Sequence, residues 1–224
     1  MERKFAGITL VSIGAVLILS ALLLFLYISL SDYEKSKENR DVYVTLVKIA
    51  EKQQAKPEVT LSEKEIESSN IEDQSVSIET ENLPIYDIIN VEYTPMTVVR
   101  IGEFDYVGFI DIPSLALSLP VLADSNERNL KASPCRQFGS PESDDFVIAG
   151  HNYRRHFANL YQVKINDVVH FTDMDGDITN YVVAAVRVVD QTDVEAVLNT
   201  DYDLILYTCD YTGKNRTIVC CKRT

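Results

Sequence analysis

The sequence predicts a mainly β domain, a barrel or a sandwich, that is preceded by a membrane helix and a linker. From about Tyr86 onward, short runs rich in Val, Ile, Tyr and Phe are bounded by Gly, Pro, Asn and Asp, which is typical of strands. Residues 5–30 are continuously apolar, whereas residues 58–82 are acidic, rich in serine and poor in large apolar side chains. The chain therefore divides into an anchor, a connecting segment and a folded domain: 1–30, 31–85 and 86–224.

The apolar run at the N-terminus predicts a transmembrane helix. Phe5–Leu30 contains 26 residues without a charge, and as a helix it would rise about 39 Å, more than the ~30 Å hydrocarbon core of a bilayer. Arg3 and Lys4 precede it, and cationic flanks stay in the cytoplasm, so we expect a single-pass protein of the cell membrane with its folded domain extracytoplasmic. A cleaved signal peptide is the alternative, but the run exceeds the usual ~7 to 15 apolar residues and no small-residue cleavage pattern closes it.

The connecting segment is predicted to begin as a helix and to continue as a mobile linker. Val42, Leu46 and Ile49 recur at helical spacing, and Pro57 forbids continuation of the helix. The composition of residues 58–82 favours a solvated stalk over a packed element. We expect both parts to supply location and reach rather than groove surface.

The folded domain contains seven short apolar runs that we expect to be strands. They are Tyr106–Ile112, Leu119–Leu122, Phe146–Ala149, Val168–Thr172, Thr179–Val189, Leu204–Cys209 and Thr217–Lys222. Seven or eight strands in about 120 residues indicate an all-β barrel or sandwich. Phe157 and Leu160 suggest one short helix, and Asp173–Asp177 reads as a hairpin turn, because the closing Glu of a calcium-binding loop is missing.

The charge of the chain argues against nucleic acid as a partner. The formal net charge is −13. Residues 31–100 carry 15 acidic and 8 basic side chains and residues 101–224 carry 18 and 11, so each part has a net charge of −7. No basic stripe is present that could release counterions from phosphates.

Four cysteines are present, and only one lies where a strand meets a polar turn. Cys220 and Cys221 are adjacent, so in a strand their side chains point to opposite faces, which is a poor pattern for two disulfides. No C-x-x-C motif occurs, and the histidines and cysteines lack the paired spacing of a structural zinc site. We expect Cys135, Cys220 and Cys221 to be small buried residues or idle thiols. Cys209 is the candidate nucleophile.

The order His151, Cys209, Arg216 suggests a thiol acyl-transfer enzyme. A free thiol is only a few per cent thiolate near neutral pH, so a nucleophilic cysteine needs a neighbouring base or cation. His151 ends one apolar run and could act as general acid or base, protonating the leaving amine of a cleaved peptide bond. A six-residue turn, Asp210–Asn215, would place Arg216 opposite Cys209, where it could stabilise an oxyanion or hold the substrate backbone.

The other two histidines are weaker candidates. His156 lies in an Arg154-Arg155-His156 cluster that reads as a solvated turn. His170 alternates with Val169 and Phe171, which is typical of an ordinary strand histidine. A metal site formed by His151 and His156 is disfavoured because their spacing is five, whereas neighbours on a helix face are four apart.

These residues and their surroundings resemble the sortases, the membrane-anchored cysteine transpeptidases of Gram-positive bacteria. Leu206-Tyr207-Thr208-Cys209 resembles the TLxTC motif of the family, although Ile205 stands in place of its first Thr. The other matching segments are Arg216, Gly150-His151 followed by Phe157 and Leu160, Phe109-Ile110-Asp111-Ile112-Pro113 with Leu119-Pro120-Val121, and Asn166-Asp167-Val168-Val169, in which Asn166 replaces the usual Gly. The resemblance covers roughly residues 104–223.

The resemblance implies a closed β-barrel of about eight strands with one or two short helices. It also implies a transpeptidase that cleaves an LPxTG-like sorting signal through a thioacyl-enzyme intermediate and transfers the acyl group to an amine. Cys209 would be the nucleophile, His151 the general acid or base, and Arg216 the stabilising cation. The implied partners are surface proteins that carry sorting signals, an amine on a peptidoglycan precursor or a pilin, and the membrane.

The resemblance requires no cofactor. Some sortases use calcium on loops beside the groove, and Glu142, Asp144 and Asp145 are the residues that could supply ligands here, although acids in such a loop are more often only solvated. The class of sortase stays open, since no Asp-Pro-aromatic lid motif precedes the predicted barrel.

Three other functional interpretations of the same residues stay open. A papain-like or NlpC-like cysteine peptidase uses the same residue types, but it places Cys before His and usually at a helix N-terminus. An L,D-transpeptidase carries Ser-His-Gly just before its cysteine, and this chain does not. A non-catalytic surface module would leave Cys209 an inert buried thiol.

Overall fold

The computed structural model describes residues 2–54, 96–198 and 200–224, and in α1 it does not describe the side chains of residues 2–13, 15 and 31–36. The elements are α1 (Glu2–Gln54), β1 (Val99–Ile101), β2 (Phe104–Ile112), η2 (Pro113–Leu115), β3 (Leu117–Leu122), α2 (Glu127–Ala132), β4 (Cys135–Phe138), β5 (Phe146–Ala149), η3 (Leu160–Gln162), β6 (Val168–Asp173), β7 (Ile178–Asp190), β8 (Leu204–Cys209) and β9 (Asn215–Arg223). The predicted linker over residues 58–82 and the predicted domain start at residue 86 lie outside the described residues.

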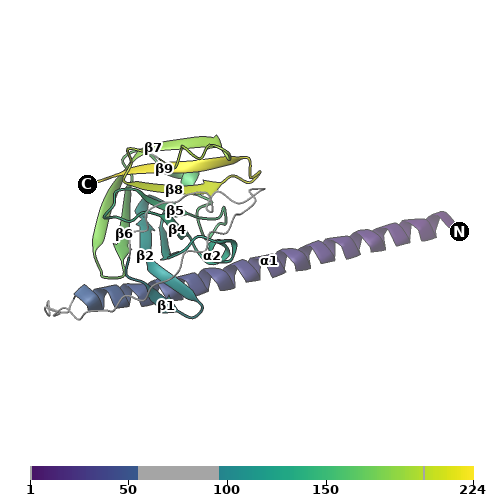
Figure 1. Ribbon diagram of the computed structural model, residues 1–224. Coiled ribbons are helices and arrows are strands. Elements are labelled where there is room, and N and C mark those ends of the chain that lie inside the picture. Colours follow the sequence, from purple (N-terminus) through teal and green to yellow (C-terminus); the bar gives the residue numbers. More distant parts are fainter. Residues whose placement is uncertain (1, 55–95, 199) are drawn as a thin grey trace, which may run out of the picture.

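The strands form a closed barrel, as the sequence predicted. The order in the sheet is β1-β2-β3-β4-β5-β8-β9-β7-β6, and a further antiparallel pairing of β2 with β6 closes the ring. Eight strands, β2 to β9, therefore form the barrel, and β1 is added to β2 outside the ring (Figure 1). Pairing is parallel between β3 and β4 and between β5 and β8, and antiparallel elsewhere.

Most of the predicted elements are present. Strands β5 and β8 have the predicted bounds, and β2, β3, β6, β7 and β9 begin and end within two residues of them. The Asp173–Asp177 turn is a hairpin, in which the Asp173 N–H donates to the Asp177 carbonyl at 3.1 Å. The predicted helix after β5 is reduced to the short 3-10 turn η3. The sequence did not indicate β1, β4 or α2.

The main core fills the barrel with alternate side chains of its strands. Strands β5, β8 and β9 contribute one residue in two to this core: Phe146 and Ile148, Leu204 and Leu206, and Val219 and Cys221. Each large apolar side chain buried in this way contributes about 1.5–3 kcal/mol to stability. Because side chains alternate along a strand, the intervening residues of β5, β8 and β9 face outward.

The C-terminal part of α1 packs against the outside of the barrel, a contact that the sequence did not indicate. Leu46 and Ala50 are buried there. The Tyr43 ring meets the Phe109 ring edge-on, with centroids 5.2 Å apart, and the Tyr43 hydroxyl donates to Asp111 Oδ1 at 2.8 Å. Val42 and Leu46, two of the apolar residues that recur at helical spacing, therefore pack against residues of β2 and β3.

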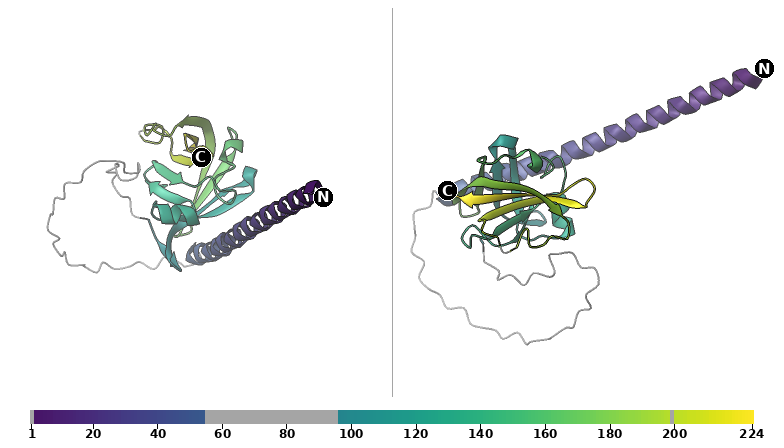
Figure 2. Two further views of the ribbon diagram at one scale, coloured as in Figure 1. Left: turned by 90° about the vertical axis from the view of Figure 1, so that its right-hand side faces the viewer. Right: turned by 90° about the horizontal axis from the view of Figure 1, so that it is seen from above.

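The N-terminal part of α1 extends well beyond the barrel (Figure 2, right). Its described large apolar side chains between Val16 and Leu30 are exposed. Across the described ranges of the chain, no helix is long and apolar enough to cross a membrane. The transmembrane helix over Phe5–Leu30 stays a prediction, and these residues are helical.

Candidate active site

Three neighbouring strands bring the predicted site residues to one end of the barrel. Strand β8 lies between β5 and β9 (Figure 1). In the parallel pair, Ala149 of β5 is opposite Tyr207 of β8, and in the antiparallel pair Cys209 is opposite Arg216. The Gly150 N–H adds one more hydrogen bond to Tyr207, and His151 follows β5 at the same end of the sheet as Cys209, because β5 and β8 run parallel. Cys209 thus ends the middle strand opposite Arg216, and His151 lies just past the end of the strand on its other side.

Cys209 is the last residue of β8, and its side chain is exposed. Ile205, Tyr207 and Cys209 alternate with the core residues of this strand, so the thiol lies on the outer face of the barrel. Thr208, its neighbour, is buried. Its position at a strand end, which the sequence predicted, and its exposure distinguish Cys209 from the three buried cysteines.

His151 is placed by a glycine and by the ring that the glycine admits. The Gly150 N–H donates to the Tyr207 carbonyl at 3.0 Å and so extends the β5–β8 pairing by one residue. A Cβ at Gly150 would lie 2.5 Å from the Phe157 ring, so another side chain here would displace this buried phenylalanine. The Phe157 N–H in turn donates to the His151 carbonyl at 3.2 Å. The loop after β5 is therefore fixed on both sides of the histidine.

The His151 ring is half-buried, and its surroundings favour the neutral form. Burial lowers the pKa of His151, and the positive charge of Lys131 lowers this pKa further, against a smaller opposite effect of Glu127. The Nε2 atom is buried and has no hydrogen-bond partner within the part of the chain that the structure describes. A neutral imidazole with one free nitrogen can accept a proton.

Arg216 lies next to the β8–β9 turn and is held from two sides. Its Nη1 donates to the Gln191 carbonyl, and its guanidinium lies over the Tyr207 ring, 5.9 Å from the centroid. Its Nε is buried without a hydrogen-bond partner among the described residues. The head group is therefore oriented while one donor stays available.

Asp210 organises the turn between Cys209 and Arg216. The Asp210 N–H donates to the Asn215 carbonyl at 2.8 Å, which continues the strand pairing into the turn. Its carboxylate accepts hydrogen bonds from the side chain of Asn215 and from Thr212, and these bonds lower the pKa of Asp210 to about 2. The ionised carboxylate thus stabilises the turn that sets the two reactive side chains opposite each other.

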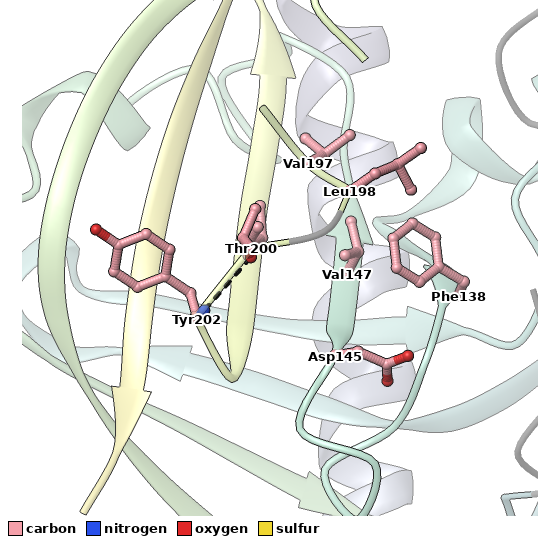
Figure 3. Close-up of a pocket in the computed structure, with 8 residues that line it drawn as sticks. Phe138, Asp145, Val147, Val197, Leu198, Thr200 and Tyr202 are labelled. Atoms are coloured by element: carbon pink, nitrogen blue, oxygen red, sulfur yellow. Dashed lines mark hydrogen bonds between the residues drawn. The ribbon is translucent and has the colours of Figure 1, made fainter. Parts of the chain in front are cut away.

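An apolar cavity of about 210 Å³ lies on the same outer face as Cys209. Figure 3 shows Phe138, Val147, Val197 and Leu198 gathered around it, while the Tyr202 ring points away. Its floor includes Ile205, four residues before Cys209 on β8, a separation of about 13 Å along a strand. The cavity and the nucleophile therefore share one side of the barrel.

The structure changes the interpretation of His156 but not that of His170. His156 was expected in a solvated turn, yet only 1% of it is exposed. Burial and the nearby Arg155 lower the pKa of His156 to about 3, so it is neutral at physiological pH. The prediction of a solvated turn was wrong because α1 and α2, which come earlier in the sequence, cover the His156 side chain. His170 lies on β6, where its Nδ1 is 2.7 Å from Asn180 Oδ1.

The other thiols are not placed for chemistry. Cys135, Cys220 and Cys221 are buried and form no disulfides. Burial raises the pKa of all three, so they stay protonated near neutral pH. This agrees with their interpretation as small buried residues.

The acidic loop before β5 is occupied by other interactions. Asp144 forms an ion pair with Arg223 at 2.6 Å, and Asp145 accepts a hydrogen bond from the Ser143 hydroxyl. Within the described residues there is no group of three or more His, Cys, Asp or Glu that could hold a metal ion.

Three residues contact the predicted site residues although the sequence did not predict these contacts. Gln191 and Tyr207 hold Arg216, and Tyr153 stacks against His151 with ring centroids 4.8 Å apart. A signal existed for the two tyrosines, because each lies two residues from a predicted catalytic residue. Nothing in the sequence indicates that a carbonyl from the end of β7 would reach Arg216.

Comparisons with known proteins point to one family. A family model described as a Sortase domain matches residues 110–224, which is more than half of the chain. Sortase A from Corynebacterium diphtheriae is 25% identical over 55% of this chain and 62% of that chain, with a TM-score of 0.50. No curated protein matches the chain.

Two further solved structures are similar. The complex of Streptococcus agalactiae sortase C1 and MTSET is 23% identical over 53% of this chain and 69% of that chain, with a TM-score of 0.49. Sortase C from Clostridium perfringens, solved with its C-terminal cell wall sorting motif, is 24% identical over 55% of this chain and 73% of that chain, with a TM-score of 0.48.

Proposed function

The chain belongs to the sortase family, and we propose that it is a cysteine transpeptidase that cleaves an LPxTG-like sorting signal through a thioacyl-enzyme intermediate and transfers the acyl group to an amine. The observation that supports this proposal most is the order of the three strands: Cys209 ends β8 opposite Arg216 of β9, and His151 follows the end of β5, which runs parallel to β8 on its other side. The family supports transpeptidase chemistry in general. The residues and substrates named below are the proposal.

In the first half of the reaction, Cys209 attacks the carbonyl carbon of the scissile Thr-Gly bond. A bond forms between Sγ and this carbon, and the thiol proton passes to the neutral ring of His151. The carbon–nitrogen bond then breaks, and His151 gives the proton to the leaving amine. The lowered pKa of His151 supports its role as the initial base. A thioacyl enzyme remains.

In the second half, a primary amine attacks the thioester carbon. His151 accepts a proton from this amine as the new carbon–nitrogen bond forms, and the carbon–sulfur bond breaks. His151 then gives this proton to the leaving Cys209 sulfur, which restores the thiol and the neutral imidazole, so the cycle consumes no energy source and needs no cofactor. We propose a peptidoglycan precursor or a pilin as the carrier of the amine.

Arg216 stabilises the oxygen that becomes negatively charged in both tetrahedral intermediates. Its head group is already held by Gln191 and by the Tyr207 ring, and its Nε lacks a protein partner among the described residues. A preoriented donor pays little reorganisation energy when the charge develops, which is why such donors contribute strongly to catalysis. The guanidinium could also hold the substrate backbone.

The apolar face that leads to Cys209 supports a peptide substrate with apolar residues. The cavity lined by Phe138, Val147, Val197 and Ile205 lies on the outer face of β5 and β8, on the same side as the thiol. The Leu and Pro side chains of a sorting signal are uncharged and would bury apolar surface there.

We also propose that the catalytic domain works on the extracytoplasmic side of the cell membrane. The large exposed apolar side chains of α1 between Val16 and Leu30 support membrane association, because extended exposed apolar surfaces mark contacts with membranes or partners. Fractionation and external protease digestion of whole cells test this location. Recovery of the protein in the cytosol, protected from external protease, would contradict it.

The decisive experiment is a ligation assay with the full chain. A panel of quenched sorting-signal peptides is incubated with triglycine or diaminopimelate, and products are identified by mass spectrometry. We expect a thioester adduct on Cys209 and a ligated product that requires the amine. Absence of cleavage with every peptide, in protein that is folded by circular dichroism, would overturn the proposal.

A cysteine peptidase of papain-like or NlpC-like type is the alternative. It would release only a hydrolysed peptide at any amine concentration, so the ratio of ligated to hydrolysed product separates the two. The order of His151 before Cys209, and the position of Cys209 at a strand end rather than at a helix N-terminus, favour the transpeptidase. A non-catalytic module would neither cleave nor ligate, but the exposed thiol disfavours it.

A further inference from the structure

Three aromatic rings form a stack that begins at His151. The Tyr153 ring lies against the His151 ring, with centroids 4.8 Å apart and an angle of 30° between the planes. The Tyr153 ring also contacts the His156 ring, with centroids 5.4 Å apart and an angle of 42° between the planes. The stack thus runs from the exposed nucleophile end of the barrel toward a buried histidine.

The buried end of the stack is fixed by two helices. His156 Nε2 is 3.0 Å from the carbonyl of Ala132, the last residue of α2, and Asn39 of α1 donates to the same carbonyl at 3.1 Å. Because a carbonyl can only accept, Nε2 of His156 carries a proton and donates it. His156 is therefore a neutral donor that anchors the stack, and it is not a second catalytic base.

The middle ring is also held in place. The Tyr153 carbonyl accepts from the N–H groups of His156 at 2.8 Å and of Ala158 at 3.2 Å. The Arg155 guanidinium lies over the Tyr153 ring, 4.9 Å from its centroid, and Arg155 Nη2 donates to the Lys131 carbonyl at 3.1 Å. Backbone and side chain of Tyr153 are thus both constrained.

The His151 ring, by contrast, is not held by a hydrogen bond from the described residues. Catalytic histidines are commonly oriented by a carboxylate or carbonyl that accepts from the second ring nitrogen. Within the described chain, no side chain forms a hydrogen bond with the His151 ring, and its buried Nε2 has no partner. The described ring contact of this imidazole is the face of Tyr153.

We propose that Tyr153 is a positioning residue that holds the His151 ring toward Cys209, a role that rests on the proposed function. The aromatic face contributes in two ways. It restricts the ring to an orientation from which proton transfer occurs, and its negative face favours the imidazolium that forms when His151 holds the proton. The hydroxyl of Tyr153 has no part in this role, so a phenyl ring should replace it.

Kinetics of two substitutions in the full chain test this role. Tyr153→Leu removes the ring, and we expect it to lower kcat about tenfold, the scale of a lost aromatic contact, with little change in KM for the peptide. Tyr153→Phe keeps the ring and should stay within about twofold of the wild type. Tyr161→Leu is the matched control, because Tyr161 lies on η3 with 62% of its surface exposed.

Two readouts do not depend on turnover. The alkylation rate of Cys209 near neutral pH should fall in Tyr153→Leu toward the rate of His151→Ala, and Tyr153→Phe should match the wild type. The His151 ring proton signals in NMR spectra of histidine-labelled protein should lose their ring-current shift only in Tyr153→Leu. If the wild type ligates no peptide, the proposed function fails, but the alkylation rates still decide the role of Tyr153.

Two outcomes would overturn the positioning role. One is a Tyr153→Leu variant with the kcat and alkylation rate of the wild type although its ring-current shift is lost. The other is an equal loss of activity in Tyr153→Phe and Tyr153→Leu, which would assign the role to the hydroxyl. Should Tyr153→Leu fail to fold, Tyr153→Met, which fills a similar volume without a ring, gives the same test.

Discussion

The two ends of the β8–β9 pair carry the same residue type in opposite environments. At the turn end, Cys209 is opposite Arg216 and is exposed, whereas at the other end Cys220 and Cys221 are opposite Ile205 and Leu204 and are fully buried. Burial raises the pKa of Cys220 and Cys221, so these thiols stay protonated. Reactivity in this pair of strands therefore depends on position, and residue type alone does not decide it.

The buried end is apolar on both faces of the sheet. Cys221 points into the barrel core with Leu204 and Tyr181, and Cys220 points outward into a cluster with Val147 and Val197. The turn end has the reverse character, because the polar turn at Asp210 follows directly. Substitutions at the turn end of this strand pair should therefore change activity, whereas substitutions at the buried end should change stability.

The largest expected effect is the loss of activity on removing the thiol at the turn end. Cys209→Ala should lower peptide cleavage and ligation at least ~10⁴-fold, because no other described thiol lies beside His151 and Arg216. Steady-state assays with the best peptide of the panel measure this, and the melting temperature should stay close to that of the wild type.

Cys220→Ala and Cys135→Ala are the matched controls for this prediction. Both thiols are buried, and neither is at the turn end of the strand pair where Cys209 is opposite Arg216, so both variants should retain most of the activity per folded molecule. Substantial turnover in Cys209→Ala would remove the thiol mechanism and the distinction between the two ends.

A smaller effect is expected from a change of geometry at the turn end without a change of charge. Arg216→Lys keeps the cation but loses the planar set of donors that Gln191 and the Tyr207 ring orient, so kcat should fall ~10²-fold. Arg216→Ala should be lower still. Activity of Arg216→Lys close to the wild type, with Arg216→Ala inactive, would mean that charge alone suffices at this position.

At the buried end we expect a loss of stability rather than of chemistry. Cys221→Ser places a hydroxyl in the apolar core beside Leu204 and Tyr181 and should cost about 1–3 kcal/mol of unfolding free energy. Chemical denaturation measures this cost, and Cys221→Ala is the less polar control. A loss of kcat in a variant that is fully folded would contradict the separation of the two ends.

The sequence predicted the strand ends that carry His151, Cys209 and Arg216 better than it predicted the elements that pack around them. Strands β5 and β8 were predictable because each is a continuous apolar run that stops at a polar residue, and the order of His151, Cys209 and Arg216 places them on adjacent strand ends. The alternation rule also assigned Cys220 and Cys221 to opposite faces, which the core clusters confirm.

The supports were not predictable because they depend on contacts between distant parts of the chain. β4 contains Arg136 and Gln137, so its sequence lacks the apolar run that predicted the other strands. It also pairs in parallel with β3, so no tight turn between the two strands indicated it. The helical spacing around Leu46 was visible, but the face of the barrel that buries it was not. His156 looked solvated because of its two arginine neighbours, and only α1 and α2, which pack over it, show that it is buried.

The smallest effect that we predict concerns the charges around His151 at the turn end. Lys131 and Glu127 on α2 are both exposed and form an ion pair with each other. Lys131 lowers the pKa of His151 and Glu127 raises it. Because His151 must be neutral to accept the thiol proton, the acidic limb of the pH profile of kcat/KM should follow this pKa.

Removal of each charge should therefore move the acidic limb in opposite directions. Lys131→Met removes a cation that disfavours the imidazolium, so the pKa of His151 rises, the limb moves to higher pH, and activity at the acidic edge falls. Glu127→Gln removes the opposite influence and should move the limb to lower pH. Both shifts should shrink at high salt, since exposed charges are screened, and the plateau rate should be unchanged. A limb that moves the same way in both variants, or in neither, would assign it to a group other than His151.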